Sequence, residues 1–163
     1  MPSRDDIGLA TCKRLLATGS NISDVRTSAI AATEAQKAVT SMLQLYGSKA
    51  AAVLKQKKTK TVTLSTLEYL FSGNCLGISR VDLSSAPRKG KGQRGVPLAG
   101  VERIFREMLE SDGRITEDAK KALVGAAEAY LHTLGKNAGL MAQAGRRKTI
   151  QGSDVLAARK IND

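Results

Sequence analysis

Apolar residues recur at helical spacing along both halves of the chain, and polar breaks divide each half into three segments. In the first half the pattern predicts a short helix that ends at residues 18–21. A helix of about 28 residues follows, from a cap at Ser28 to Lys55, and then a short helix over residues 64–71. In the second half it predicts a helix over residues 99–110, a long helix from a cap at Thr116 to Ala144, and a final helix over residues 152–160.

The long helices carry apolar stripes that neither could bury alone. The stripe of the first long helix is expected to contain Ile30, Val39, Met42, Leu43, Tyr46, Ala50 and Val53. Ile7 is placed in the first short helix, Met108 on the inward face of residues 99–110, and Leu156 inward in the last helix. Gly125, Gly135 and Gly139 lower the helix propensity of the second long helix, and such small residues permit close helix crossings. We therefore expect the two halves to pack across each other.

The two halves repeat one pattern. Ser23-Asp24-Val25-Arg26-Thr27-Ser28 resembles Ser111-Asp112-Gly113-Arg114-Ile115-Thr116, and Lys60-Thr61-Val62 resembles Lys148-Thr149-Ile150, both at a displacement of 88 residues. The short helices at residues 12–16 and 101–105 match with a slip of one residue. Between the halves, residues 84–95 are rich in Gly, Ser and basic residues and read as a flexible basic linker. The predicted units are residues 1–83 and 96–163.

Composition narrows the function. Only 3% of the 163 residues are aromatic, and no apolar run reaches the roughly 18 residues of a membrane span. The chain begins without a signal-peptide pattern, so an intracellular protein with no membrane role is expected. The two cysteines, Cys12 and Cys75, lack metal-ligand spacing and are expected to be reduced, partly buried thiols, and His132 is the single histidine. With dispersed acids and no phosphate-cradling glycine motif, we expect no catalytic site, metal or cofactor.

Charge is the strongest bulk signal. Lys and Arg number 26 against 15 acidic residues, a formal charge of +11. Such a field favours phosphate backbones, although an acidic protein partner or a membrane surface stays open on charge alone.

With its loops placed, the chain resembles a histone doublet, two histones fused in tandem. The second half carries the closer match, resembling archaeal histones in Pro97-Leu98-Ala99, Arg103-Ile104, Arg114-Ile115-Thr116, residues 144–150 and Asp154. Glu128-Ala129-Tyr130-Leu131 and Ala158-Arg159-Lys160-Ile161 resemble histone three, and Lys60-Thr61-Val62-Thr63 resembles histone four. The resemblance runs from Ile7 to Ile161. It implies an all-α protein of two tandem histone folds that join in an intrachain handshake pseudo-dimer.

The resemblance also implies the binding residues. The first loop of one unit should lie beside the second loop of the other, which groups Arg26 with residues 146–148 and Arg114 with residues 57–60. The family's DNA contacts fall on Arg14, Arg26, Lys57, Lys58, Lys60, Thr61, Arg103, Arg114, Arg146, Arg147, Lys148 and Thr149. Arg147 and Asp154 match a family ion pair that ties the second loop to the last helix. The first half has Thr59 and Thr66 instead, so its loop is expected to be looser.

As function, the resemblance implies wrapping and compaction of double-stranded DNA in a nucleosome-like particle, together with other doublets or further copies. It places the protein with DNA in a nucleus, viral factory or virion, or an archaeal nucleoid. The first half also resembles histone two-B, so the pairing type stays open between histone four/three and two-B/two-A. Ala144 stands where histone three has a histidine at its self-association interface. A histone-fold transcription or architectural subunit acting through protein partners is the main alternative, and a helical RNA-binding protein is a lesser one.

Overall fold

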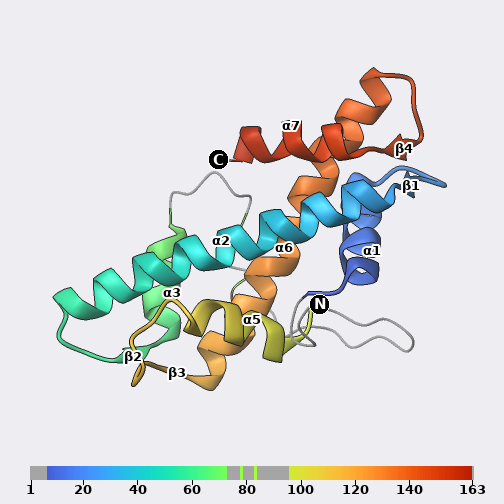
Figure 1. The fold of residues 1–163 in the computed structure, drawn as a ribbon. Coiled ribbons are helices and arrows are strands. Elements are labelled where there is room, and N and C mark those ends of the chain that lie inside the picture. The colour runs from blue at the N-terminus through green and yellow to red at the C-terminus, as the bar shows by residue number, and fades with distance from the viewer. Residues whose placement is uncertain (1–6, 73–77, 79–82, 84–95, 163) are drawn as a thin grey trace.

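The protein is described from a computed structural model, in which residues 7–72, 78, 83 and 96–162 are placed (Figure 1). Helices make up most of this structure, and the first half supplies α1 (Leu9–Ser20), α2 (Ala29–Gln56) and α3 (Leu64–Phe71). The second half supplies α5 (Leu98–Arg106), α6 (Glu117–Ala144) and α7 (Gly152–Asn162). Four two-residue strands lie in the loops: β1 (Arg26–Thr27), β2 (Thr61–Val62), β3 (Arg114–Ile115) and β4 (Thr149–Ile150).

The two long helices begin at the predicted caps. The Ser28 hydroxyl accepts a hydrogen bond from the Ala31 amide at 3.0 Å, and Thr116 accepts one from the Ala119 amide at 3.3 Å. Each cap satisfies an amide that the first helical turn leaves without a backbone partner. Both helices are 28 residues long, so the predicted repeat extends to the length of its central element.

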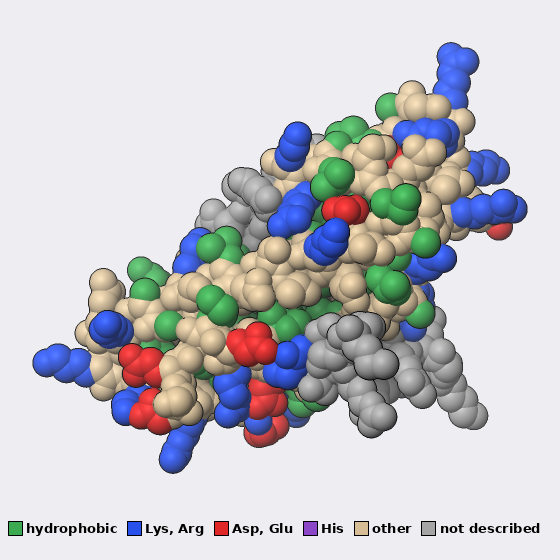
Figure 2. All heavy atoms as spheres, in the orientation of Figure 1, with side chains coloured by type: hydrophobic (Ala, Val, Ile, Leu, Met, Phe, Trp, Pro, Cys, Tyr) green, Lys and Arg blue, Asp and Glu red, His purple; other side chains and the backbone are tan. Residues whose placement is uncertain are grey.

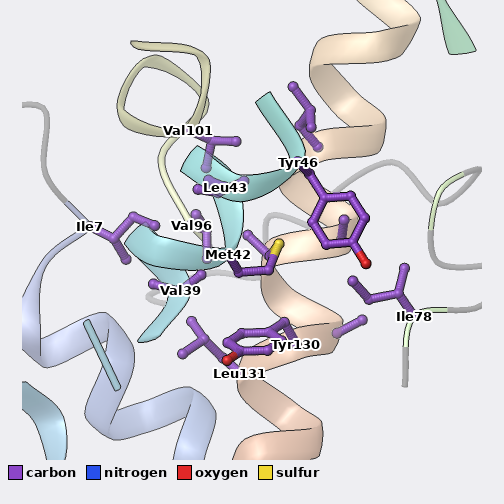
Figure 3. Packing of buried hydrophobic residues seen from close by; sticks show 14 of the residues in the cluster. Ile7, Val39, Met42, Leu43, Tyr46, Ile78, Val96, Val101, Tyr130 and Leu131 are labelled. Atoms are coloured by element: carbon purple, nitrogen blue, oxygen red, sulfur yellow. The ribbon is translucent and has the colours of Figure 1, made fainter. Parts of the chain in front are cut away.

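Helices α2 and α6 cross near their middles, with the shorter helices packed around the crossing (Figure 1). Met42 and Tyr46 of α2 lie in the same hydrophobic core as Tyr130 of α6 (Figure 3). The core continues outward through Phe71 of α3, whose ring stacks on Tyr46 with centroids 4.4 Å apart. Because both long helices contribute to a single core, neither half buries its apolar stripe on its own.

Glycines set the closeness of two equivalent helix crossings. A Cβ on Gly135 of α6 would lie 2.7 Å from the Cα of Leu16 in α1 and would clash with the Leu16 carbonyl. A Cβ on Gly47 of α2 would lie 2.9 Å from the carbonyl oxygen of Phe105 in α5. Gly47 and Gly135 are 88 residues apart, while Leu16 and Phe105 are 89 apart, as the slip in the repeat predicts. The close crossing predicted at Gly135 is present, and Gly47, which was not predicted, is its counterpart.

The loop strands join one half of the chain to the other. Strand β1 pairs with β4 in parallel, with Arg26 opposite Thr149 and Thr27 opposite Ile150. Strand β2 pairs with β3, also in parallel, with Thr61 opposite Arg114 and Val62 opposite Ile115. The first loop of each unit therefore lies beside the second loop of the other, at opposite ends of the molecule (Figure 1). This is the predicted handshake arrangement.

Several side chains differ from the expected pattern. Helix α5 ends at Arg106, because tight turns carry the chain from Arg103 to Leu109, so that Leu109 is buried and Met108 is 37% exposed. In α7, Val155 and Ala158 face the core three residues apart, which turns the intervening Leu156 toward solvent at 45% exposure. Ile30 and Val53 were also expected in the core. Ile30 is 67% exposed, although it lies beside Gly152 at the start of α7, and Val53 is half-buried. Ile7 is buried but precedes α1, where its carbonyl accepts a hydrogen bond from Gln36 of α2.

The predictions for the linker and for Cys75 concern residues that the structure does not describe. The linker covers residues 84–95, so the unit boundaries at residues 83 and 96 stay predictions. None of the described helices combines the length and the hydropathy needed to cross a membrane.

Candidate nucleic-acid interface

The end of the molecule that carries β1 and β4 exposes basic side chains from both halves. The Arg26 amide donates to the carbonyl of Lys148 at 2.9 Å, and the Ser28 amide donates to the carbonyl of Ile150 at 3.0 Å. These backbone bonds fix the loop of Arg26 against the loop of residues 146–148. Arg26, Arg146 and Lys148 are exposed there, and Arg146 has a left-handed φ of 57°. We call this region the β1–β4 end.

The opposite region, the β2–β3 end, repeats the arrangement. The Arg114 amide donates to the carbonyl of Lys60 at 2.8 Å, and the Thr116 amide donates to the carbonyl of Val62 at 3.1 Å. Arg114, Lys57 and Lys58 are exposed, and Lys58 has a φ of 53°, close to that of Arg146. Thr61 and Thr149 lie directly opposite Arg114 and Arg26 in the two registers, so each predicted arginine has a predicted threonine beside it.

Arg147 has a structural partner in this arrangement. Its Nη1 donates to Asp154 Oδ2 at 2.8 Å and its Nη2 donates to Asp154 Oδ1 at 3.0 Å. Asp154 also accepts from the Gln151 amide at 2.8 Å, and the residue is only 5% exposed. The hydrogen bonds from Arg147 hold the pKa of the Asp154 carboxyl below its usual value, although burial opposes that shift. The pair ties the loop before β4 to α7, and it leaves Arg146 and Lys148 as the outward-facing cations of this loop.

The matching loop of the first half keeps its backbone shape without an ion pair. The Thr59 amide donates to the Leu54 carbonyl at 3.0 Å, as the Arg147 amide does to the Ala142 carbonyl at 2.9 Å. Thr66, which stands where the second half has Asp154, is 9% exposed and forms a capping box with Thr63 at the start of α3. A short polar side chain therefore replaces a charged one with no buried charge left over.

The short helices carry the last two predicted contacts. Arg14 in α1 is half-buried, its neighbour Lys13 is exposed, and α1 contains no acidic residue. Arg103 in α5 donates to Glu107 at 2.7 Å, one helical turn away. The i, i+4 spacing of Arg103 and Glu107 is the sequence signal for this ion pair. The prediction of Arg103 as a DNA contact did not take that pairing into account.

Other proteins share the sequence pattern and the fold of this chain. Residues 94–158 match the family described as "Histone-like transcription factor (CBF/NF-Y) and archaeal histone". The crystal structure of the histone from Methanopyrus kandleri superposes with a TM-score of 0.73 at 25% sequence identity, over 93% of this chain and 92% of that one. The chain has the histone fold.

The relatives in sequence are subunits of a nuclear transcription factor. The B-2 subunit of nuclear transcription factor Y from Oryza sativa subsp. japonica is 29% identical over 96 residues, which is 56% of this chain and 54% of that protein. The B subunit of the same factor from Zea mays is 31% identical over 65 residues, 40% of this chain and 36% of that protein. The chain thus spans about half or less of the curated relatives it matches.

One cation of the histone-fold loops pairs across the two halves. Lys60, beside β2, forms an ion pair with Asp112, beside β3, and the hydrogen bond from Lys60 is the main reason that the pKa of Asp112 is lowered. The charge of Arg114 lowers the same pKa further. A cavity of about 320 Å³ opens beside this pair. Its lining includes the buried Leu54 and Leu109 and the exposed Lys55, Lys58, Lys60, Glu110 and Asp112.

Cys12 and His132 are the cysteine and the histidine among the described residues. Cys12 is buried, and burial raises the pKa of its thiol to about 12, so it is an unreactive packing residue. His132 lies in α6 where α1 crosses, and its Nε2 has no hydrogen-bond partner among the described residues. Within the described residues, no three His, Cys, Asp or Glu side chains gather as a metal site.

Proposed function

We propose that this histone-fold protein binds double-stranded DNA through its phosphate backbone and bends the duplex around the two ends of the handshake. The observation that carries the proposal is the pairing of each loop arginine with the basic loop of the other half, Arg26 with residues 146–148 and Arg114 with residues 57–60. Two separate basic ends on one rigid core can hold a duplex at two points, which is what bending requires.

The chemistry of these ends favours backbone contact over base readout. The groups at these ends are exposed Lys and Arg side chains and half-buried loop threonines, which suit phosphate oxygens. An arginine held at a parallel strand bridge can enter a narrowed minor groove, where the negative potential is concentrated. The excess of 26 basic over 15 acidic residues supplies the long-range attraction. Further copies, or other histone-fold chains, would extend the bound path into a nucleosome-like particle. The protein would then reside wherever such DNA is packaged.

Nuclease digestion tests the bending and wrapping. The chain, bound at saturation to long DNA of mixed sequence, is expected to leave discrete protected lengths. A featureless smear at saturation would rule out wrapping, even if binding itself were retained.

Charge reversal tests the assignment of the ends. Changing Arg114, Lys57 and Lys58 to Glu should weaken binding to all duplex sequences and flatten its dependence on salt. The matched control reverses three exposed lysines in the middle of the long helices, Lys37, Lys49 and Lys136, for the same change in net charge. If both triple variants lose affinity equally, only net charge matters and the β2–β3 end is not part of the interface.

A partner-dependent transcription factor component is the second candidate. It is favoured by the relatives named as components of nuclear transcription factor Y. This candidate expects weak binding by the isolated chain, and a marked preference for particular sequences once a partner is added. Competition between mixed-sequence duplexes for the isolated chain separates the two: sequence-independent binding without a partner supports packaging.

A further inference from the structure

We propose that the two ends are unequal phosphate-binding sites: the β1–β4 end is the principal anchor for the duplex, and acidic residues of the chain itself partly neutralise the β2–β3 end. This inference rests on the proposed function, because it assigns the bound duplex to one end before the other.

The balance of charge around the two ends differs. Residues 7–30 and 143–154, which form α1 and the β1–β4 end, hold six basic and two acidic residues. Residues 55–66 and 96–118, which form α5 and the β2–β3 end, hold seven basic and six acidic residues. The face shown in Figure 2 agrees: acidic side chains lie among the basic ones near α5 and β3, whereas basic side chains dominate around β1 and β4.

Ion pairs make this difference local. At the β2–β3 end Lys60 pairs with Asp112, whose carboxylate also interacts with the charge of Arg114. The equivalent residues of the β1–β4 end, Lys148 and Asp24, are both described and form no ion pair with each other. A phosphate approaching Lys60 must therefore compete with a carboxylate already in place, and one approaching Lys148 need not.

The neighbouring short helices extend the contrast. In α5, Arg103 pairs with Glu107 at 2.7 Å and Arg106 with Glu102 at 2.5 Å. In α1, Lys13 and Arg14 have no acidic residue on their own helix, and no described acidic residue pairs with them. The cavity at the β2–β3 end adds Glu110 beside Asp112, so a phosphate entering it would meet carboxylates as well as lysines.

Matched double variants of the full chain test the inequality. R26Q/K148Q and R114Q/K60Q remove equivalent residues, 88 positions apart, and the same charge. Binding to a short fluorescent duplex of mixed sequence is measured over a range of salt concentrations, where each lost phosphate contact flattens the logarithmic salt slope by about 0.9. We expect R26Q/K148Q to flatten it by about two contacts and R114Q/K60Q by about one. Equal flattening, or more at the β2–β3 end, would overturn the proposal.

Single variants test the cause. D112N releases Lys60 and should steepen the salt slope by about 0.9, since it frees one cation for phosphate. D24N is the matched control, because it removes one carboxylate at the other end without freeing an ion-paired lysine, and Asn tolerates the left-handed φ of 56° found there. The same slope in both variants would refute the role of the Lys60–Asp112 pair. If the unmodified chain shows no salt-dependent duplex binding, the proposed function itself fails, which is a separate result; circular dichroism verifies that each variant is folded.

Discussion

Replacing Gly135 by Ala tests the closeness of the crossing between α1 and α6. The new methyl group would lie 2.7 Å from the Leu16 Cα and 2.8 Å from its carbonyl carbon. Carbon atoms in contact prefer about 3.5–4.0 Å, so α1 would have to shift by roughly 1 Å. The obstruction is helix backbone and has no rotamer to adopt, which places the cost near the top of the usual overpacking range, about 3 kcal/mol.

The substitution also brings a gain. Alanine improves helix propensity by about 1 kcal/mol over glycine, so the free energy of unfolding should fall by about 2 kcal/mol net. For a chain of this size that corresponds to a decrease in Tm of roughly 4–8 °C. The assay is denaturant and thermal unfolding followed by circular dichroism at the helical band. Because the two halves share one core, we expect a single transition.

Two further glycines supply the controls. Gly47→Ala meets the Met108 Cβ and the Phe105 carbonyl at 2.9 Å, a smaller overlap next to a turn, and should change stability by less than about 1 kcal/mol. Gly8→Ala has nothing within 4 Å and should cost at most about 1 kcal/mol, because Gly8 is the N-cap of α1 and alanine caps a helix less well. A Gly135→Ala protein as stable as Gly8→Ala would show that α1 does not pack on α6 as closely as described.

Three further predictions concern the ion pair and the buried thiol. Asp154→Ala should lower the free energy of unfolding by about 2–3 kcal/mol, because it breaks charge-assisted hydrogen bonds and leaves Arg147 unpaired. The equivalent change in the first half, Thr66→Ala, should cost about 1 kcal/mol. Equal losses in denaturant unfolding would contradict the structural role of the ion pair. The pKa of Asp154 is lowered in the folded protein, so its carboxylate should stabilise the fold at neutral pH. This stabilisation should disappear as the pH falls below the normal carboxyl pKa and through the lowered one. Unfolding measured over an acid titration should show the loss in the wild type and not in Asp154→Asn. In a Cys75→Ser protein, the remaining thiol of Cys12 should react with a thiol reagent only as fast as the chain unfolds, and rapid labelling under native conditions would show that it is accessible.

The helices and their order in each half could be predicted from the sequence because the signals for them are local and repeated. Ser28 and Thr116 cap the long helices through side-chain bonds to amides three residues away, an interaction that short-range spacing reveals. The displacement of 88 residues predicts that the loops of Arg26 and Arg114 occupy equivalent positions in the two halves. The strand registers agree, because Arg26 lies opposite Thr149 and Arg114 lies opposite Thr61. The handshake itself came from the family resemblance and not from periodicity.

The ion pair at the β2–β3 end and the hydrogen bonds that hold the segments before α1 and α5 join residues far apart in the sequence, so no local pattern predicts them. Asp112 lies 52 residues from Lys60, so their pairing follows from the handshake and from no motif. Gln36 donates to the Ile7 carbonyl at 2.6 Å, and Glu128 accepts from the Val96 amide at 3.2 Å; both anchor the segments that lead into α1 and α5. Leu156 was misplaced for another reason, since a short helix with several apolar positions has more than one possible inward face.

The duplicated crossings at Gly47 and Gly135 have a consequence for evolution. A pair of identical subunits related by a two-fold axis must present two identical ends, since every substitution appears in both. Joining the subunits in one chain removes that constraint while fixing their ratio at one to one. Each end can then change independently around the shared central packing, and the folded unit has a polarity along any duplex it binds, which a symmetric dimer cannot have.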